Sequence, residues 1–235
     1  MRALSSHDLL ALWESGSRLH PLDQGLLAVR IALPEDKRAT VGDWTLGRRN
    51  RALLELHSAC FGSHLHAWAA CERCGEKMEF EVEIRSLLGD SEESPREVET
   101  VLVDGRTFRL PTSRDLAEAV RDNDATRGAL CLLDRCHIAG DAAGWTEEYA
   151  NLVGERFAKA DPIAELRLAL ACPACGEEVE ESLDPVTFFW SELQATARRI
   201  LLQVHTLASA YGWSEREILG LSDTRRSLYL QMVNA

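Results

Sequence analysis

The chain contains one short motif twice, Cys71-Glu72-Arg73-Cys74-Gly75 and Cys172-Pro173-Ala174-Cys175-Gly176, and the predicted architecture is built around this repetition. In each copy a glycine follows the second cysteine, and glycine permits the positive φ that a tight turn needs. A Cys-x-x-Cys turn presents both sulfurs to one point, so two such turns supply the four ligands of a closed tetrahedral zinc site. We therefore predict one structural Zn²⁺ per chain, bound by Cys71, Cys74, Cys172 and Cys175.

The segments beside each motif predict a hairpin. After the first motif, residues 78–84 alternate apolar and acidic side chains, the period expected of a strand with one wet face. A shorter exit strand is predicted through 179–183. The two knuckle hairpins together define a zinc ribbon that is split by a long insertion, residues 76–171. Such a separation is acceptable because closure entropy grows only logarithmically with loop length.

Around this ribbon the sequence predicts an α+β protein that is mainly α-helical. Apolar spacing indicates helices within 5–60, and Asp104-Gly105 between two apolar runs predicts a small β-hairpin in the insertion. Further helices are predicted at 112–120, 125–138 and 146–160. Asp184-Pro185 begins the clearest helix with an N-cap and a first-turn proline. Its predicted buried face consists of Phe189, Leu193, Ala197, Ile200, Val204, Leu207 and Tyr211.

We expect five consecutive segments that fold as one cooperative unit, because zinc binding would join the two distant motifs and is coupled to folding. The segments are an N-terminal helical segment (1–62), a first zinc-knuckle hairpin (63–88), an inserted hairpin plus helices (89–162), a second zinc-knuckle hairpin (163–183) and C-terminal helices (184–235).

Other cysteines and histidines are given structural interpretations. Cys60, Cys131 and Cys136 lie in apolar helical contexts and are expected to be small buried side chains. His64 and His66 precede the first motif and could substitute as ligands, but four cysteines already complete the shell, which favours a surface role. His205 is interpreted as a core or interface histidine.

The charge pattern argues against nucleic acid. The net charge is −12; residues 71–104 carry eleven acids against four bases, and residues 177–184 carry five acids and no base. Phosphates there would meet carboxylates, without the Lys and Arg that drive counterion release. A solvated acidic face is the simpler interpretation. No apolar run approaches the roughly 20 residues of a membrane span, and no signal peptide is visible, so a cytoplasmic location is expected.

The C-terminal third carries a longer pattern, with Phe188-Phe189-Trp190-x-Glu192-Leu193, Val204-His205-x-Leu207-Ala208, Ala210-Tyr211-Gly212-Trp213-Ser214-Glu215 and Arg225-Arg226. This pattern resembles the baseplate proteins of contractile-tailed phages, the group that contains the T-even phage baseplate hub assembly protein and members in phage-like contractile injection systems. Earlier segments such as Leu46-Gly47-x-Arg49 fit as well, so the resemblance covers roughly residues 8–232.

This resemblance implies a non-enzymatic structural or assembly component of a phage-tail-like particle. Its partners would be other baseplate or hub proteins, with multiple copies in the larger assembly, and no catalytic residue is carried over. The residues agree with this, because the chain has no glycine-rich phosphate loop, no Gly-x-Ser-x-Gly elbow and no His-Glu-x-x-His helix. The acidic knuckle region and the aromatic C-terminal helices are the expected docking surfaces.

Two other classes stay open. A zinc-ribbon regulatory protein that binds nucleic acid or a transcription partner would use the same cysteines, but it needs a basic stripe. A thiol-redox or hydrolytic enzyme would use the Cys-x-x-Cys pairs as free dithiols, which thiol titration separates from zinc thiolates.

Overall fold

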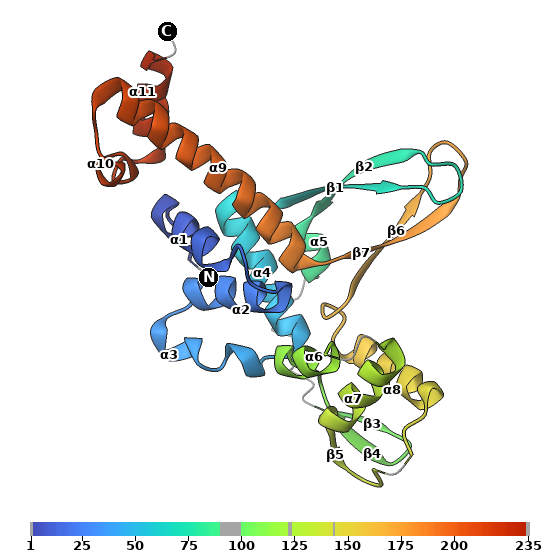
Figure 1. Cartoon of the computed structure of the whole chain (residues 1–235). Coiled ribbons are helices and arrows are strands. Elements are labelled where there is room, and N and C mark those ends of the chain that lie inside the picture. Colours follow the sequence, from blue (N-terminus) through green and yellow to red (C-terminus); the bar gives the residue numbers. More distant parts are fainter. Residues whose placement is uncertain (1, 90–99, 122–123, 143, 234–235) are drawn as a thin grey trace.

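The computed structural model describes residues 2–89, 100–121, 124–142 and 144–233, and it combines helices with small antiparallel sheets (Figure 1). The helices are α1 (Ser6–Gly16), α2 (Pro21–Ala32), α3 (Glu35–Arg38), the 3-10 turn η1 (Val41–Asp43), α4 (Leu46–Phe61), α5 (Ile84–Leu88), α6 (Ser113–Ala119), α7 (Ala125–Cys136), α8 (Glu147–Ala160), α9 (Pro185–Tyr211), α10 (Glu215–Leu219) and α11 (Asp223–Val233). The strands are β1 (His64–Ala70), β2 (Lys77–Glu83), β3 (Thr100–Val103), β4 (Arg106–Arg109), β5 (His137–Ala139), β6 (Leu166–Ala171) and β7 (Glu178–Leu183). Within the described ranges, no helix has both the length and the apolar character that crossing a membrane requires.

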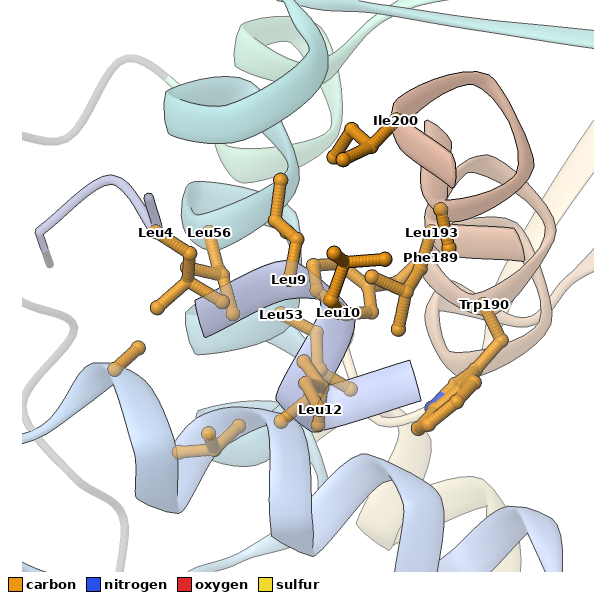
Figure 2. Packing of buried hydrophobic residues seen from close by; sticks show 14 of the residues in the cluster. Leu4, Leu9, Leu10, Leu12, Leu53, Leu56, Phe189, Trp190, Leu193 and Ile200 are labelled. Atoms are coloured by element: carbon orange, nitrogen blue, oxygen red, sulfur yellow. The ribbon is translucent and has the colours of Figure 1, made fainter. Parts of the chain in front are cut away.

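The long helix α9 runs diagonally through the molecule as its spine (Figure 1). Asp184 caps this helix as predicted, because its carboxylate accepts hydrogen bonds from the backbone amides of Val186 and Thr187 at 3.1 and 3.3 Å. Leucines of α1 and α4 pack against the buried face of α9 around Phe189 and Leu193, as Figure 2 shows. The predicted buried face is confirmed as far as Leu207, whereas Tyr211 is exposed.

Helices α1 and α11, from the N-terminal and C-terminal parts of the chain, are linked beside α9. Helices α10 and α11 follow Gly212, whose φ of +70° ends α9, and α11 packs back on the spine. Arg226 in α11 is buried and donates hydrogen bonds to Gln203 of α9 at 2.8 Å and to Ser6 of α1 at 3.0 Å. The N-terminal and C-terminal helices therefore share one core.

Helix α4 holds the segment through which the chain enters the second hairpin. The Gly47 amide donates to the Asp161 carboxylate at 2.9 Å, and the Asn50 side-chain amide donates to the carbonyl oxygens of Ile163 and Ala164 at 2.9 and 3.1 Å. We call residues 161–164 the junction. These bonds fix where strand β6 leaves the helical body.

The inserted hairpin and the helices that follow it form a separate lobe, which we call the inserted lobe. In it, strands β3, β4 and β5 pack against α7 and α8 around Phe108 (Figure 1). The sequence predicts a helix through Ile138, which is wrong: α7 ends at Cys136, and the next three residues pair with the open edge of β4 as strand β5. Pairing supplies that edge with hydrogen-bond partners that a continued helix would leave unmet. Ile84, predicted at the end of a strand, instead begins the short helix α5.

A buried carboxylate joins helix α6 to strand β4 and helix α7 within the inserted segment. Asp115 closes the predicted capping box with Thr112 and also accepts hydrogen bonds from Arg109 at 2.6 and 2.8 Å and from Arg135 at 3.0 Å. Burial alone would raise the pKa of the Asp115 carboxyl, but its hydrogen bonds with Arg109 and Thr112 hold the pKa well below the ordinary range.

Two hairpins, which we call the first ribbon (β1–β2) and the second ribbon (β6–β7), extend from the helical body side by side (Figure 1). Their inner faces carry apolar side chains: near the body, Leu65 joins Leu166 and Leu183, and near the tips Ala69 and Met78 join the cysteines. Because strand side chains alternate, the opposite faces of both ribbons point to solvent. The Cys-x-x-Cys turns occupy the two tips.

Candidate metal centre

Each cysteine turn is closed by its own backbone. In the first turn the Cys71 amide donates to the Glu76 carbonyl at 2.9 Å, and the Gly75 amide donates to the Cys71 carbonyl at 2.8 Å. In the second turn the equivalent distances are 2.8 and 2.9 Å. The glycines have φ values of +76° and +72°, a conformation that side-chain-bearing residues rarely adopt. The predicted role of both glycines is therefore confirmed.

The structure brings the four predicted ligands together from positions about one hundred residues apart. Their four sulfur atoms all lie within 4.8 Å of one another. The closest approaches join the two turns, with 3.6 Å between the sulfurs of Cys71 and Cys175 and 3.6 Å between those of Cys74 and Cys172. These separations far exceed the roughly 2.0 Å of a disulfide bond, and all seven cysteines are free thiols.

The cluster is shielded on its inner side and reachable from its outer side. Cys71 and Cys172 are buried, Cys175 is half-buried and Cys74 is exposed. Apolar side chains of both ribbons surround the two buried cysteines, including Ala69 and Met78. On the outer side, Arg73 of one turn forms an ion pair with Glu177 of the other at 3.0 Å. The two ribbon tips are thus in contact through side chains as well as sulfurs.

Backbone amides of the turns point at the sulfur atoms. The Cys74 amide, helped by that of Arg73, lowers the pKa of the Cys71 thiol to about 7. The Glu177 amide also lowers the pKa of the Cys175 thiol, but burial and the neighbouring cysteine sulfurs outweigh it and raise the pKa to about 12. One thiolate forms readily, whereas four adjacent thiolates repel one another unless a cation lies among them.

This arrangement can hold a metal ion. Four sulfur donors on two turns can surround one ion completely, and thiolates favour soft or borderline metals over Mg²⁺ or Ca²⁺. The amides that face the sulfurs would hold them in place, because second-shell hydrogen bonds orient the ligands. A fully ligated ion has no open position for water or substrate.

The other predicted histidines and cysteines lie away from the cluster. His64 and His66 are exposed on β1, where their ring nitrogens lie 3.8 and 3.9 Å from the Glu81 carboxylate. His205 is exposed on α9, outside the buried face that contains Val204 and Leu207, so of its two interpretations the core residue is wrong and the interface residue stays a prediction. Of the three remaining cysteines, Cys136 is buried as predicted, and Cys60 and Cys131 are only half-buried.

The exposure of Trp68 in the first ribbon was not predicted from the sequence. Trp68 lies in the lead-in strand, where an apolar residue is expected to be buried, yet 68% of its surface is exposed. Its position two residues after His66 was the available signal, because i and i+2 residues share one face of a strand.

Comparison with known proteins places the chain in no group: no family model matches it, and neither does any curated protein or solved structure.

Proposed function

We propose that the chain is a non-enzymatic structural or assembly component of the baseplate or hub of a contractile phage-tail-like particle. The observation that carries this proposal is the C-terminal pattern and its resemblance to baseplate proteins. Part of that pattern has a packing role here, since Phe189, Trp190 and Leu193 belong to the main core (Figure 2). Val204 and Leu207 belong to the same core. The aromatic residues that follow lie at the C-terminal end of α9, where Trp213 stacks on Tyr211 at 4.7 Å and meets Tyr229 edge-on at 4.9 Å.

The bound metal in this proposal is one structural Zn²⁺. Zinc–sulfur bonds of about 2.3 Å in a tetrahedron place the sulfurs about 3.8 Å apart. The two closest sulfur pairs, each at 3.6 Å, are near that value, and the limit of 4.8 Å for all pairs is compatible with it after small adjustments. Because zinc completes its shell with four thiolates, its role would be to hold structure and not to activate water.

The geometry of the ribbons supplies a physical reason for such an ion. An isolated two-stranded hairpin is only marginally stable, and these two extend beyond the helical body (Figure 1). An ion at the tips would close the pair into one rigid arm, and the free energy of metal binding would then contribute to folding. The arm could present its outer faces to a partner in a fixed orientation.

The zinc-ribbon regulator stays as the second candidate, because the four-sulfur cluster suits it equally well. The charges on the outer faces of the ribbons disfavour it, since Glu79 and Glu81 on the first ribbon and Glu178 and Glu180 on the second would face the phosphates. Neither ribbon, over its described residues, carries the row of basic side chains that a nucleic-acid-binding surface needs.

Sedimentation of native lysate from the source cells, with this chain blotted across the gradient, tests the proposed function. Co-migration with a large tail-like particle is expected of a baseplate component, and a smaller protein complex is expected of an assembly factor. A change in the sedimentation of the chain after nuclease treatment would favour the zinc-ribbon regulator. A chain that sediments as a free monomer would refute both the baseplate component and the assembly factor. Metal analysis of freshly purified protein tests the ion separately: less than about half an equivalent of zinc per chain would refute the site.

A further inference from the structure

The outer face of the first ribbon carries two rows of polar and aromatic side chains. Across the paired strands, His64 lies opposite Glu83, His66 opposite Glu81, and Trp68 opposite Glu79. Residues at alternate positions share one face, and the inner face is the apolar one described above. We call this surface the outer face of the first ribbon, and it consists of His64, His66, Trp68, Ala70, Lys77, Glu79, Glu81 and Glu83.

Trp68 is the feature of this face that the fold does not require. Most tryptophans gain stability by burying 150–250 Å² (an approximate range), but this ring is 68% exposed and leaves most of that area in water. Tryptophan is also strongly enriched among the residues that contribute most to protein–protein binding. An exposed tryptophan on a projecting arm therefore indicates a contact surface.

A shallow groove of about 420 Å³ lies beside this ring. The groove is lined by His66, Ala67, Trp68, Glu79, Phe80 and Glu81. The indole supplies an aromatic wall, and the two glutamates place carboxylates on the neighbouring strand. An aromatic face next to carboxylates is suited to a cation, which the ring attracts electrostatically and the carboxylates neutralise.

One positive group of the chain itself, Lys77, already lies on this face. The Lys77 ammonium is 5.9 Å from the centre of the Trp68 ring, in the range of cation–aromatic attraction. The Glu81 carboxylate faces the ring nitrogens of His64 and His66 at 3.8 and 3.9 Å. A cationic group of the chain thus lies over the Trp68 ring, and an incoming cationic side chain would take the place of Lys77 there.

We propose that the outer face of the first ribbon binds a lysine- and arginine-containing segment of a protein partner, with one cationic side chain over Trp68 and ion pairs to Glu79 and Glu81. This inference deepens the proposed function and rests on it, because it names the partner chemistry for one docking surface. Nucleic acids and anionic lipids are disfavoured as occupants, because their phosphates would be repelled by the same carboxylates.

The outer face of the second ribbon provides a matched comparison within the same chain. It also carries acids on a two-stranded hairpin, but Glu178 lies opposite Ala171 and Glu180 opposite Ala169, and Arg167 of the same face lies opposite Ser182. Glu180 forms an ion pair with Arg167 at 3.0 Å. This face has acidic side chains but no aromatic ring. A partner that recognises only negative charge would therefore bind both ribbons.

The experiment titrates a peptide of alternating arginine and glycine into the full-length, zinc-loaded chain. Calorimetry measures affinity, and NMR follows the indole N–H signal of Trp68, which the Trp68→Phe variant assigns by its loss. That signal is expected to shift on binding, and Trp68→Ala is expected to weaken binding about fivefold, as for an exposed cation–aromatic contact. The Trp68 side chain is exposed, so this variant is expected to fold, and thermal unfolding checks it.

Two double variants change the charge equally and separate the two ribbons. Glu79→Gln with Glu81→Gln is expected to weaken binding at least about tenfold, and Glu178→Gln with Glu180→Gln by less than about twofold. Equal losses in the two double variants, or no binding by the parent chain, would overturn the inference. If the peptide binds through Trp68 but the chain is found in no large particle, the proposed function is refuted and the inference about the outer face stands. Presence in the particle without Trp68-dependent binding would refute the inference alone.

Discussion

Substituting Gly47 by alanine is expected to destabilise the protein by about 3 kcal/mol, because the junction lies directly against this residue. The Gly47 amide donates to one Asp161 carboxylate oxygen at 2.9 Å, and a methyl group added at Gly47 would lie 1.6 Å from the other. The carboxylate would have to turn away from α4. The variant would lose a hydrogen bond to a charged group, worth about 1.5–3 kcal/mol, and would carry overpacking strain of about 1–3 kcal/mol.

Urea unfolding followed by circular dichroism measures this loss. In thermal unfolding, about 3 kcal/mol corresponds to a midpoint lowered by roughly 6–12 °C in a chain of this size. Gly154 provides the control, since it is exposed in α8 and an alanine methyl group there would meet nothing within 4 Å. Gly154→Ala is expected to stabilise the protein by about 0.5–1 kcal/mol, because alanine is the better helix former.

A double variant tests the physical cause. Asp161→Ala alone removes the hydrogen bond and the carboxylate, so Gly47→Ala added to it has nothing left to displace. The double variant is therefore expected to be about as stable as Asp161→Ala alone. Additive losses from the two substitutions, or a change below about 0.5 kcal/mol for Gly47→Ala, would refute the reasoning, because contacting residues should show coupling.

Three further predictions concern the metal centre and the inserted lobe. Treatment with a strong chelator, or substitution of Cys74 or Cys175 by serine, should make the ribbons sensitive to protease, whereas Cys131→Ser should not. A Cys74→Ser variant as resistant as the parent would count against the proposed structural ion. Asp115→Asn should cost about 3 kcal/mol near pH 7, because it leaves two arginines without their carboxylate. Because the pKa of Asp115 is depressed in the folded state, its contribution to stability is fully present above the ordinary carboxyl pKa of about 3.9 and is lost as the pH falls below it. Urea unfolding near pH 3 should therefore show a smaller stability difference between Asp115→Asn and the parent. An equal difference at both pH values would contradict the stabilising role of the ionised carboxylate. Burial raises the pKa of the Cys136 thiol to about 12, so this cysteine should resist alkylation near pH 8 until the chain unfolds, as mass spectrometry can follow; alkylation of the folded protein at the rate of the unfolded chain would be the contrary result.

Local features of the fold were predictable because they depend on neighbouring residues. The two glycines after the cysteine pairs, the capping box of Thr112 and Asp115, and the Asp184 cap all act over a few positions of the chain. Such motifs have the same backbone geometry wherever they occur, so the spacing of residue types is enough to predict them.

Edges and faces were less predictable, since they depend on what packs against them. Strand β5 exists because β4 offers an open edge, and Ile138 therefore leaves the predicted helix. His205 and Trp68 are both exposed for the same kind of reason: each points away from the neighbour that covers the opposite face of its element. Periodicity predicts that a face exists but does not say which partner covers it.

The chemistry of the candidate metal centre was predictable from the two motifs, because a Cys-x-x-Cys-Gly turn specifies two sulfurs and their orientation within five residues. The meeting of the two turns, with all four sulfurs within 4.8 Å of one another, is a property of the folded chain that neither motif predicts alone. That meeting depends on the bonds from Gly47 and Asn50 to the junction and on the apolar faces between the ribbons. Contacts between residues more than one hundred positions apart form only when the whole chain packs, so no local pattern encodes them.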